Sequence, residues 1–373
     1  MAAQKAQRQN QEHQSATAGN SKIGCAAQAS KVLLLTGTPL VNRPSDIAPL
    51  LNMIVKDHIR LTVPTGLWSS RVFTDIPTDE GFVRAFGEDG LNAVGRAVWK
   101  ELLPCVLSHF QPERTPDFPT MTTETVKVPM TPEQATVYRA WETQSLTRSM
   151  VAMLSRQTSV PPDLAHLPRF RAYLDGGRRI CNMVQVQGHT YAPKFARLLD
   201  LLEQNPGPAL VFSHYLNQGV RVAEDLLRER GITYVLFTGQ ETDRQKKEAV
   251  ERYNRQQVRV FLSSPAGGVG LDLHDTVSVH IMEPGWNEAL ILQAIYRAVR
   301  YKSHSQPQAV VKVYRYYCYR RVMPLTTPLP PSADVYLMEV SRRKERVNQR
   351  FLEYALQHSM EQSDVGQCVV EGL

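Results

Sequence analysis

The sequence lacks several features that would mark a secreted, membrane-spanning or zinc-binding protein. No two cysteines have the Cys-x-x-Cys spacing, and the five cysteines lie far apart, at positions 25, 105, 181, 318 and 368. This arrangement indicates neither a disulfide framework nor a zinc site, and it favours an intracellular protein. No apolar stretch typical of a secretory signal opens the chain, and no run approaches the roughly 20 apolar residues of a membrane span. No membrane partner is expected.

The sequence also contains no Gly-Lys dipeptide. The phosphate-binding loop of many ATPases ends in Gly-Lys-Ser/Thr, because backbone N–H groups and a lysine ammonium group together hold the phosphates. The acidic pair Asp79 and Glu80 in "PTDEGF" does not follow an apolar strand. We therefore predict a turn there, rather than the acidic pair that holds Mg²⁺ in such enzymes.

Length and charge narrow the class of protein further. The chain has 373 residues and a formal net charge of +7. This length is enough to bury a sizeable core and to form two or more domains. The positive charge favours a polyanionic partner such as nucleic acid, although many basic proteins bind none.

Hydrophobic patterns divide the chain into five predicted regions. Residues 1–30 are polar and predicted to be disordered. Region 31–125 opens with "KVLLL", predicted to be a buried strand, and continues with a predicted helix over residues 44–54. Region 126–194 is predicted to be a linker with helical segments, in which Thr131 and Pro132 begin a helix. Region 319–373 is predicted to be a basic helical extension.

The clearest pattern covers residues 195–318. Apolar runs at 209–213, 232–237, 258–264, 277–282 and 309–317 alternate with amphipathic segments. This alternation predicts an α/β domain with a mostly parallel sheet and helices on both faces. Ligands of such domains gather at the carboxyl ends of the strands.

One candidate ligand loop is "LSSPAGGVGLDL", which follows an apolar run. Its glycines, Gly267, Gly268 and Gly270, can adopt positive φ and allow backbone N–H groups to approach a phosphate closely. Tight turns also require glycine, so the cluster alone leaves a purely structural role open.

A second candidate is the segment "NEALILQAIYRAVRYKSH". In a helix beginning at Asn287, Gln293, Arg297 and Arg300 fall on one face. The opposite face holds the apolar residues Ile291, Ile295, Ala298 and Val299. The polar face is either an ordinary solvated surface or a pair of arginine fingers that stabilise charge on a transferring phosphoryl group.

The order of the motifs adds a family resemblance. The segments "TGTP", "ALVFSHYLNQGVRVAEDLL", "LFTGQETDRQKKEAVERYN", "FLSSPAGGVGLDL" and "EPGWNEALILQAIYRAVR" follow one another. In this order they resemble the carboxyl-terminal half of superfamily 2 helicases, particularly Swi/Snf-type translocases on double-stranded DNA. "VKVPMTPEQATVYRAW" and "RRICNMV" resemble the segments that join the two motor lobes in this family. The ending "RAVRYKSH" differs from the "GRAHRIGQ" of chromatin remodellers and is more similar to helicases of large DNA viruses.

The resemblance implies a RecA-like second lobe, ATP with Mg²⁺ as cofactor and double-stranded DNA as partner. It makes Gln293, Arg297 and Arg300 the residues that reach the γ-phosphate. The remaining implied roles are coupling of nucleotide state to strand movement at Thr36, Gly37 and Thr38; nucleic-acid contacts at Ser213, Thr238, Gly239, Ser263, Ser264 and Trp286; and nucleotide contacts at the lobe interface at Gly267, Gly268, Gly270 and Asp272.

Three positions need separate comment. The family usually has glycine where this chain has Tyr296, and often asparagine where it has Asp272. Trp286 resembles the tryptophan that bridges the two lobes of the family, but a buried core indole is an equally open interpretation.

The segment "LLLTGTPLVN" resembles the last signature of a first lobe. Because no phosphate loop accompanies it, we expect an incomplete first RecA-like lobe, with the missing part and most of the ATP site supplied in cis or in trans. The "KVLLL" strand would then lack neighbours, so we expect weak order before about residue 125. Two alternatives remain open: a stand-alone nucleic-acid-binding or regulatory lobe without ATPase activity, and a Rossmann-type enzyme using "AGGVG", whose spacing is not G-x-G-x-x-G.

Overall fold

The chain forms two compact units. One unit is continuous in sequence, and the other is built from the segments before and after it. The computed structural model describes residues 32–55, 61–66, 69–110, 115–156, 167–265, 271–321 and 329–362. The first unit contains the part before residue 113 and the part after residue 343, and the second unit is Glu113–Arg343. Each unit has its own hydrophobic core.

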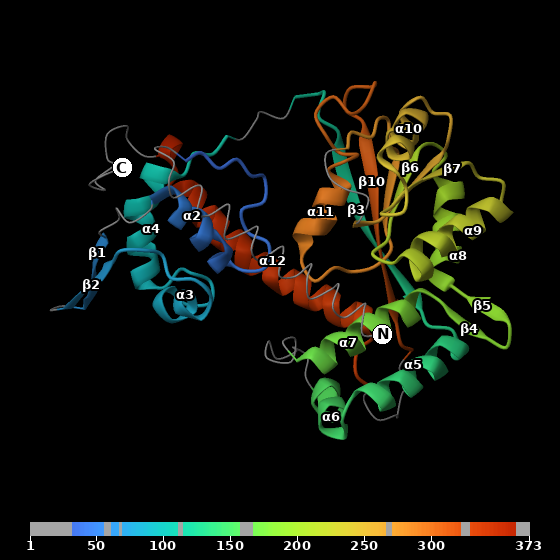
Figure 1. Cartoon of the computed structure of the whole chain (residues 1–373), viewed down its shortest axis with the longest axis horizontal. Coiled ribbons are helices and arrows are strands. Elements are labelled where there is room, and N and C mark those ends of the chain that lie inside the picture. Colours follow the sequence, from blue (N-terminus) through green and yellow to red (C-terminus); the bar gives the residue numbers. More distant parts are fainter. Residues whose placement is uncertain are drawn as a thin grey trace. The chain divides into compact units, whose positions relative to one another are not determined.

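The first unit is mainly helical (Figure 1). Its elements are a 3-10 turn at Pro44–Asp46, α2 (Ile47–Val55), the antiparallel pair β1 (Leu61–Gly66) and β2 (Ser69–Phe73), α3 (Asp79–Phe86), α4 (Ala93–Val106), the second part of α12 (Ala333–Gln357) and a 3-10 turn at Met360–Gln362. The helix predicted over residues 44–54 is confirmed. The turn predicted at Asp79 and Glu80 is wrong, because both residues lie in the first turn of α3.

The first unit has a hydrophobic core, and the weak order predicted before residue 125 stays a prediction. Phe82, Phe86 and Trp99 are fully buried, and the Trp99 indole N–H donates to the Gly90 carbonyl oxygen at 2.7 Å. The prediction of a buried strand at "KVLLL" is wrong over its described part. Leu33 is 82% exposed and forms no strand, because no strand among the described residues pairs with this segment.

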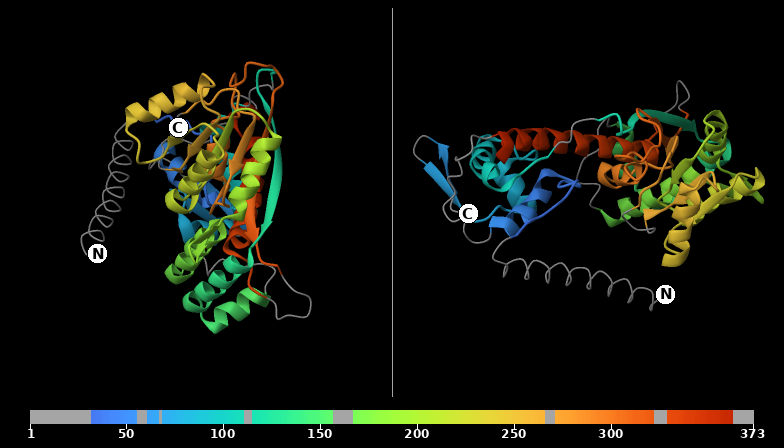
Figure 2. Two further views of the ribbon diagram at one scale, coloured as in Figure 1. Left: turned by 90° about the vertical axis from the view of Figure 1, so that its right-hand side faces the viewer. Right: turned by 90° about the horizontal axis from the view of Figure 1, so that it is seen from above.

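The second unit contains the predicted parallel sheet. Six strands lie in the order β3-β10-β9-β6-β8-β7, and every neighbouring pair is parallel. The strands are β3 (Thr120–Pro129), β6 (Ala209–Phe212), β7 (Tyr234–Phe237), β8 (Val260–Ser263), β9 (Ser278–Ile281) and β10 (Val310–Tyr319). The two ten-residue strands, β3 and β10, extend well beyond their four-residue neighbours (Figure 2). Strands β6, β8 and β9 are buried along their whole length, as expected for a sheet covered on both faces.

Helices cover both faces of this sheet, which confirms the predicted α/β arrangement. Apolar side chains of α8 (Pro193–Gln204) and α9 (Arg221–Glu229) pack on one face. Those of α10 (Asp243–Asn254) and α11 (Glu288–Ile295) pack on the other (Figure 1). The carboxyl ends of the strands carry the polar residues described below.

A third group of elements in this unit lies between β3 and α8 in sequence. It comprises α5 (Pro132–Ser145), α6 (Arg148–Arg156), α7 (Pro168–Asn182) and the hairpin of β4 (Val184–Val186) and β5 (His189–Tyr191). Helix α5 begins as predicted, because the Thr131 hydroxyl accepts from the Gln134 N–H at 3.2 Å in a capping box. A hydrophobic cluster around Tyr138, Phe170 and Tyr336 joins α5, α7 and the first turns of α12.

Candidate functional site

Polar residues follow three neighbouring strands at one edge of the sheet. Ser213 comes directly after β6, Ser263 ends β8, and Thr238 comes directly after β7. The Ser213 N–H donates to the Ser263 carbonyl oxygen at 3.0 Å, and the Ser264 N–H donates to the Phe237 carbonyl oxygen at 3.2 Å. The structure therefore brings these predicted nucleic-acid residues together, where parallel strands of α/β proteins present ligand sites.

The hydroxyl groups at this edge are bonded inside the protein. Ser213 and Thr238 are each 1% exposed. The Ser213 hydroxyl donates to Glu283 at 2.6 Å, and the Thr238 hydroxyl donates to Glu241 at 2.7 Å. Gly239, by contrast, is exposed. These two hydroxyls therefore shape the loops in this conformation, and their contact with nucleic acid stays a prediction.

The segment that carries the predicted arginine fingers differs from the expected continuous helix. Helix α11 ends at Ile295, and the Tyr296 N–H donates to the Leu292 carbonyl oxygen before the chain continues through turns. Arg297 points inward, is 9% exposed, and donates to the Ser263 hydroxyl at 3.3 Å. Burial lowers the pKa of its guanidinium group. The prediction that Arg297 shares one helix face with Gln293 is therefore wrong.

Gln293 and Arg300 are the exposed polar residues of this segment. Gln293 lies on the solvent side of α11, and the Arg300 side chain is 54% exposed and forms an ion pair with Asp272. The predicted apolar face is confirmed by the burial of its four residues, Ile291, Ile295, Ala298 and Val299. Ser264 is also buried.

The remaining predicted site residues belong to three other parts of the sequence. Gly267, Gly268 and Gly270 lie outside the described residues. Thr36, Gly37 and Thr38 belong to the first unit, where the Thr38 N–H donates to the Thr36 hydroxyl at 3.1 Å. Trp286 is partly buried and packs against the cluster around Tyr138. This packing agrees with the core-indole interpretation and leaves its nucleic-acid role a prediction.

Sequence reasoning missed the buried acid Glu283, which follows β9. Its carboxylate is 0% exposed and accepts from Ser213, from the Asn182 amide and from the His214 N–H. Burial alone would raise the pKa of Glu283, but the nearby charges of Lys194 and Arg178, together with His214 and these hydrogen bonds, hold it below its usual value. The available signal was an acidic residue directly after the apolar run "VSVHIM", because a buried carboxylate needs partners.

A fully buried ion pair lies next to Glu283. The Lys194 ammonium group donates to Asp334 and to the Met282 carbonyl oxygen, both at 2.9 Å. Both side chains are 0% exposed. Burial raises the pKa of Asp334, although Lys194 acts in the opposite direction. The pair joins α8 and α12 to the end of β9.

The described residues include no group of three or more His, Cys, Asp or Glu side chains that could hold a metal ion. Within the same ranges, no helix is long and apolar enough to cross a membrane. The candidate site is therefore an edge of backbone amides, buried hydroxyls, one exposed glutamine and one exposed arginine.

The fold and this polar edge define a parallel α/β lobe with helices on both faces of its sheet. Comparison with protein families identifies the family more closely. Residues 193–302 match the helicase conserved C-terminal domain, and residues 10–186 match the SNF2-related domain. The chain therefore carries an SNF2-related domain followed by a helicase C-terminal domain, which confirms the predicted Swi/Snf-type relationship.

The relatives include viral and cellular proteins. A putative ATP-dependent RNA helicase of Acanthamoeba polyphaga mimivirus is 27% identical over 89% of this chain and 71% of its own length. A second mimivirus protein of the same description is 22% identical over 81% of this chain and 56% of its own. An ISWI chromatin-remodeling complex ATPase of Arabidopsis thaliana is 24% identical over 72% of this chain. The chain spans only 24% of that last relative.

Solved structures of SWI2/SNF2 ATPases resemble this chain weakly. The C-terminal part of the Fun30 ATPase domain is 12% identical, with a TM-score of 0.42 over 63% of this chain and 99% of that one. The Sulfolobus solfataricus SWI2/SNF2 ATPase core in complex with dsDNA is 15% identical, with a TM-score of 0.41 over 64% of this chain and 51% of that one. Similarity at this level carries no argument about what this chain binds.

Proposed function

We propose that this chain is the carboxyl-terminal motor portion of an ATP-dependent DNA helicase or translocase. It binds the nucleic-acid backbone at the strand ends and supplies an arginine during hydrolysis of the γ-phosphate. The observation that carries the proposal is the exposed Gln293 and Arg300 on the same lobe as the strand ends of β6, β8 and β7. The SNF2-related and helicase C-terminal matches, in that order, support it.

Arg300 is the better candidate for the arginine finger. A guanidinium group offers five N–H donors in a planar fork that matches phosphoryl oxygens. The ion pair with Asp272 is half-exposed on both sides. Such surface pairs contribute only about 0–1 kcal/mol, so Arg300 can exchange Asp272 for a phosphate at little cost. Arg297 holds β8 to the following turns through Ser263 and would have to leave a buried position to act.

The residues fit ATP only in part. Gln293 and Arg300 suit the phosphates of a nucleotide, whose charge a positioned arginine stabilises electrostatically. The described residues lack a carboxylate cluster for Mg²⁺, and the sequence lacks a Gly-Lys phosphate loop. The metal and most contacts to ATP are therefore assigned to residues outside the described site, in a first lobe supplied in cis or in trans.

The first test measures binding of the full chain to a fluorescently labelled DNA duplex by anisotropy over a series of KCl concentrations. We expect affinity to fall linearly in a log-log plot, because each phosphate contact releases counterions. The same titration with a single strand of the same sequence and with an RNA duplex shows which kind of nucleic acid the chain prefers. Absence of binding at low salt would overturn the proposal.

A second candidate function is a nucleic-acid-binding or regulatory lobe without ATPase activity. The absence of a Gly-Lys dipeptide favours it. ATP turnover in the presence of saturating duplex, measured with a first lobe joined to the chain, separates the two functions. Turnover that falls at least tenfold in Arg300→Ala, while duplex affinity is kept, supports the motor. Duplex binding without any turnover, even with the first lobe present, supports the binding lobe.

A further inference from the structure

A short connection between β9 and α11, residues 282–287, is held by buried side chains from other elements. At its start, the Met282 N–H donates to the Phe212 carbonyl oxygen at 3.0 Å. The Lys194 ammonium group donates to the Met282 carbonyl oxygen, and Arg178 donates to the Pro284 carbonyl oxygen at 2.7 Å. Backbone carbonyl groups of this connection are thus bonded by charged donors from α8 and α7, which are stronger than neutral donors.

Glu283 is the centre of this arrangement. One carboxylate oxygen accepts from the Ser213 hydroxyl at 2.6 Å and from the Asn182 amide at 2.5 Å. The other accepts from the His214 N–H at 2.9 Å. A buried carboxylate is stable only where several donors meet it, so Glu283 fixes the connection relative to the end of β6 and to α7.

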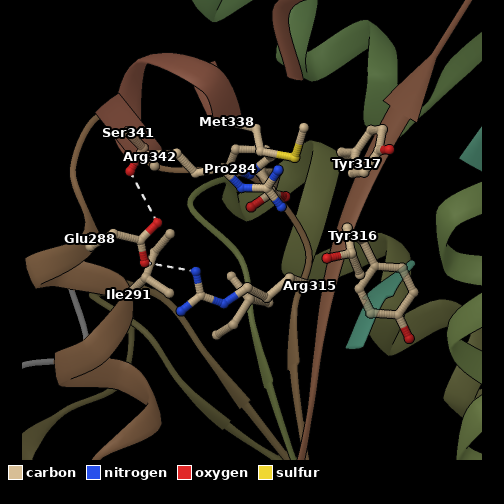
Figure 3. Close-up of a pocket in the computed structure, with 13 residues that line it drawn as sticks. Pro284, Glu288, Ile291, Arg315, Tyr316, Tyr317, Met338, Ser341 and Arg342 are labelled. Atoms are coloured by element: carbon tan, nitrogen blue, oxygen red, sulfur yellow. Dashed lines mark hydrogen bonds and ion pairs between the residues drawn. The ribbon is translucent and has the colours of Figure 1, made fainter. Parts of the chain in front are cut away.

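The other end of the connection is fixed by a second acidic residue. Glu288, the first residue of α11, accepts from Arg315 at 2.7 Å and from the Ser341 hydroxyl at 3.1 Å. Figure 3 shows Glu288 between these two partners, which come from β10 and α12. They surround a small cavity of about 40 Å³ that is also lined by Pro284 and Met338.

Trp286 lies between these two fixed ends. Its indole is partly buried against the cluster around Tyr138. Helix α11, with Gln293, begins two residues later, and the turns with Arg300 follow it. A displacement of the end of β6 by a ligand would therefore reach Trp286 and α11 through Glu283, because side chains of other elements bond the connection at both ends.

We propose that Glu283 is a positioning residue that sets the orientation of Trp286 and of the start of α11 from the end of β6. Through this link, nucleic acid at the strand ends changes the segment that carries Gln293 and Arg300. The second statement rests on the proposed function, whereas the first depends only on the contacts of Glu283.

The test compares Glu283→Gln with a matched control, Glu224→Gln. Glu224 is also buried and also accepts from three donors, Arg221, Arg228 and the Tyr234 hydroxyl, but it lies on α9 away from the connection. The full chain is labelled with 5-fluorotryptophan, and the Trp286 resonance is assigned by its loss in Trp286→Phe. We expect Glu283→Gln to shift the Trp286 ¹⁹F resonance and Glu224→Gln to leave it in place, while both variants lower the melting temperature.

Duplex affinity gives the second readout. We expect Glu283→Gln to weaken binding about tenfold, with Glu224→Gln within twofold of the unmodified chain. If Glu283→Gln does not fold, Ser213→Ala removes a single donor and must shift the Trp286 resonance in its place. An unmoved Trp286 resonance, or equal shifts in both glutamate variants, overturns the positioning role. A chain that binds no duplex overturns the proposed function instead, and the resonance still decides the role of Glu283.

Discussion

At the scale of single residues, the second unit is held together by buried charges that each have a partner. The Lys194–Asp334 pair is entirely excluded from solvent, and Glu283 lies beside it. Desolvation of an ion pair offsets much of its attraction, so such pairs add little net stability. Removal of one partner is strongly destabilising, because it leaves the other charge buried and unpaired.

Lys194→Met is therefore expected to destabilise the second unit by about 3–5 kcal/mol. The substitution keeps the length of the side chain and removes the charge that opposes Asp334 and Glu283. Native-state hydrogen exchange of the β6 and β9 amides measures the free energy of opening. Arg230→Met is the control, because its ion pair with Glu203 is exposed on both sides and contributes about 0–1 kcal/mol. Equal losses in the two variants would contradict the expectation.

Two buried histidines predict how stability depends on pH. Burial lowers the pKa of His214 to about 4 and that of His280 to about 3, from an ordinary 6.5. Both are neutral in the folded chain, and the unfolded chain takes up protons first as the pH falls. Their contribution to the free energy of unfolding is complete above about pH 6.5 and is lost as the pH falls toward 4. The loss is on the order of 3 kcal/mol for each histidine.

Urea unfolding midpoints between pH 7 and pH 4.5 test this dependence. His280→Gln removes one of the two titrating groups, while its amide can still bond the hydroxyl groups of Tyr316 and Ser278, which lie 2.8 and 3.0 Å from the histidine nitrogens. We expect the decline between pH 6.5 and pH 5 to be about half as steep in this variant. An unchanged slope would show that His280 titrates normally in the folded chain.

At the scale of helices and strands, local patterns predicted the elements well and their ends poorly. The five apolar runs between residues 209 and 317 became five strands of the sheet, because buried parallel strands have continuous apolar sequences. The pairing of β3 with β10 was not predicted, since contacts between residues about 190 positions apart leave no local pattern. The position of Arg297 was predicted wrongly because the helical pattern of the sequence continues beyond Ile295, whereas helix α11 ends at that residue.

The same limit applies to the candidate site. The exposed positions of Gln293 and Arg300 could be predicted from amphipathic spacing. The burial of Ser213 and Thr238 could not, because it depends on Glu283 and Glu241, which the motifs do not include. The prediction of a strand at "KVLLL" was wrong for a similar reason, because an apolar run forms a buried strand only where a neighbouring strand pairs with it.

The short π-helix at Leu216–Val220, which follows the end of β6, depends on one glycine. A Cβ atom at Gly219 would lie 1.9 Å from the Ser213 hydroxyl oxygen, which is bonded to Glu283. Gly219→Ala is expected to destabilise the second unit by about 1–3 kcal/mol through overpacking and to disturb the Ser213–Glu283 bond. Differential scanning calorimetry measures the loss. Gly231→Asn is the control, since a Cβ there meets nothing within 4 Å and asparagine tolerates its φ of +66°. Equal melting temperatures for the two variants would contradict the clash.

At the scale of the whole molecule, the chain contains separate hydrophobic cores. Phe82, Phe86 and Trp99 belong to the core of the first unit, which Phe351 of α12 completes. The aromatic residues Tyr138, Phe170 and Tyr336 belong to the second unit. The first unit therefore has the buried aromatic area that a stable fold needs, which the sequence had led us to doubt.

Paired tryptophan substitutions test whether each core stabilises its own unit. Trp99→Ala removes a fully buried indole and is expected to destabilise the first unit by about 3–5 kcal/mol. Hydrogen exchange followed by mass spectrometry should show faster exchange in α3 and α4, while the β6 amides serve as the internal reference. Trp141→Ala is the reciprocal variant, because the Trp141 indole bonds the Tyr173 carbonyl oxygen at 3.1 Å within the second unit, and it should accelerate exchange in α5 and α7. If Trp99→Ala leaves exchange in α3 and α4 unchanged, the first unit does not depend on this core, and the weak order expected from its sequence is the better description.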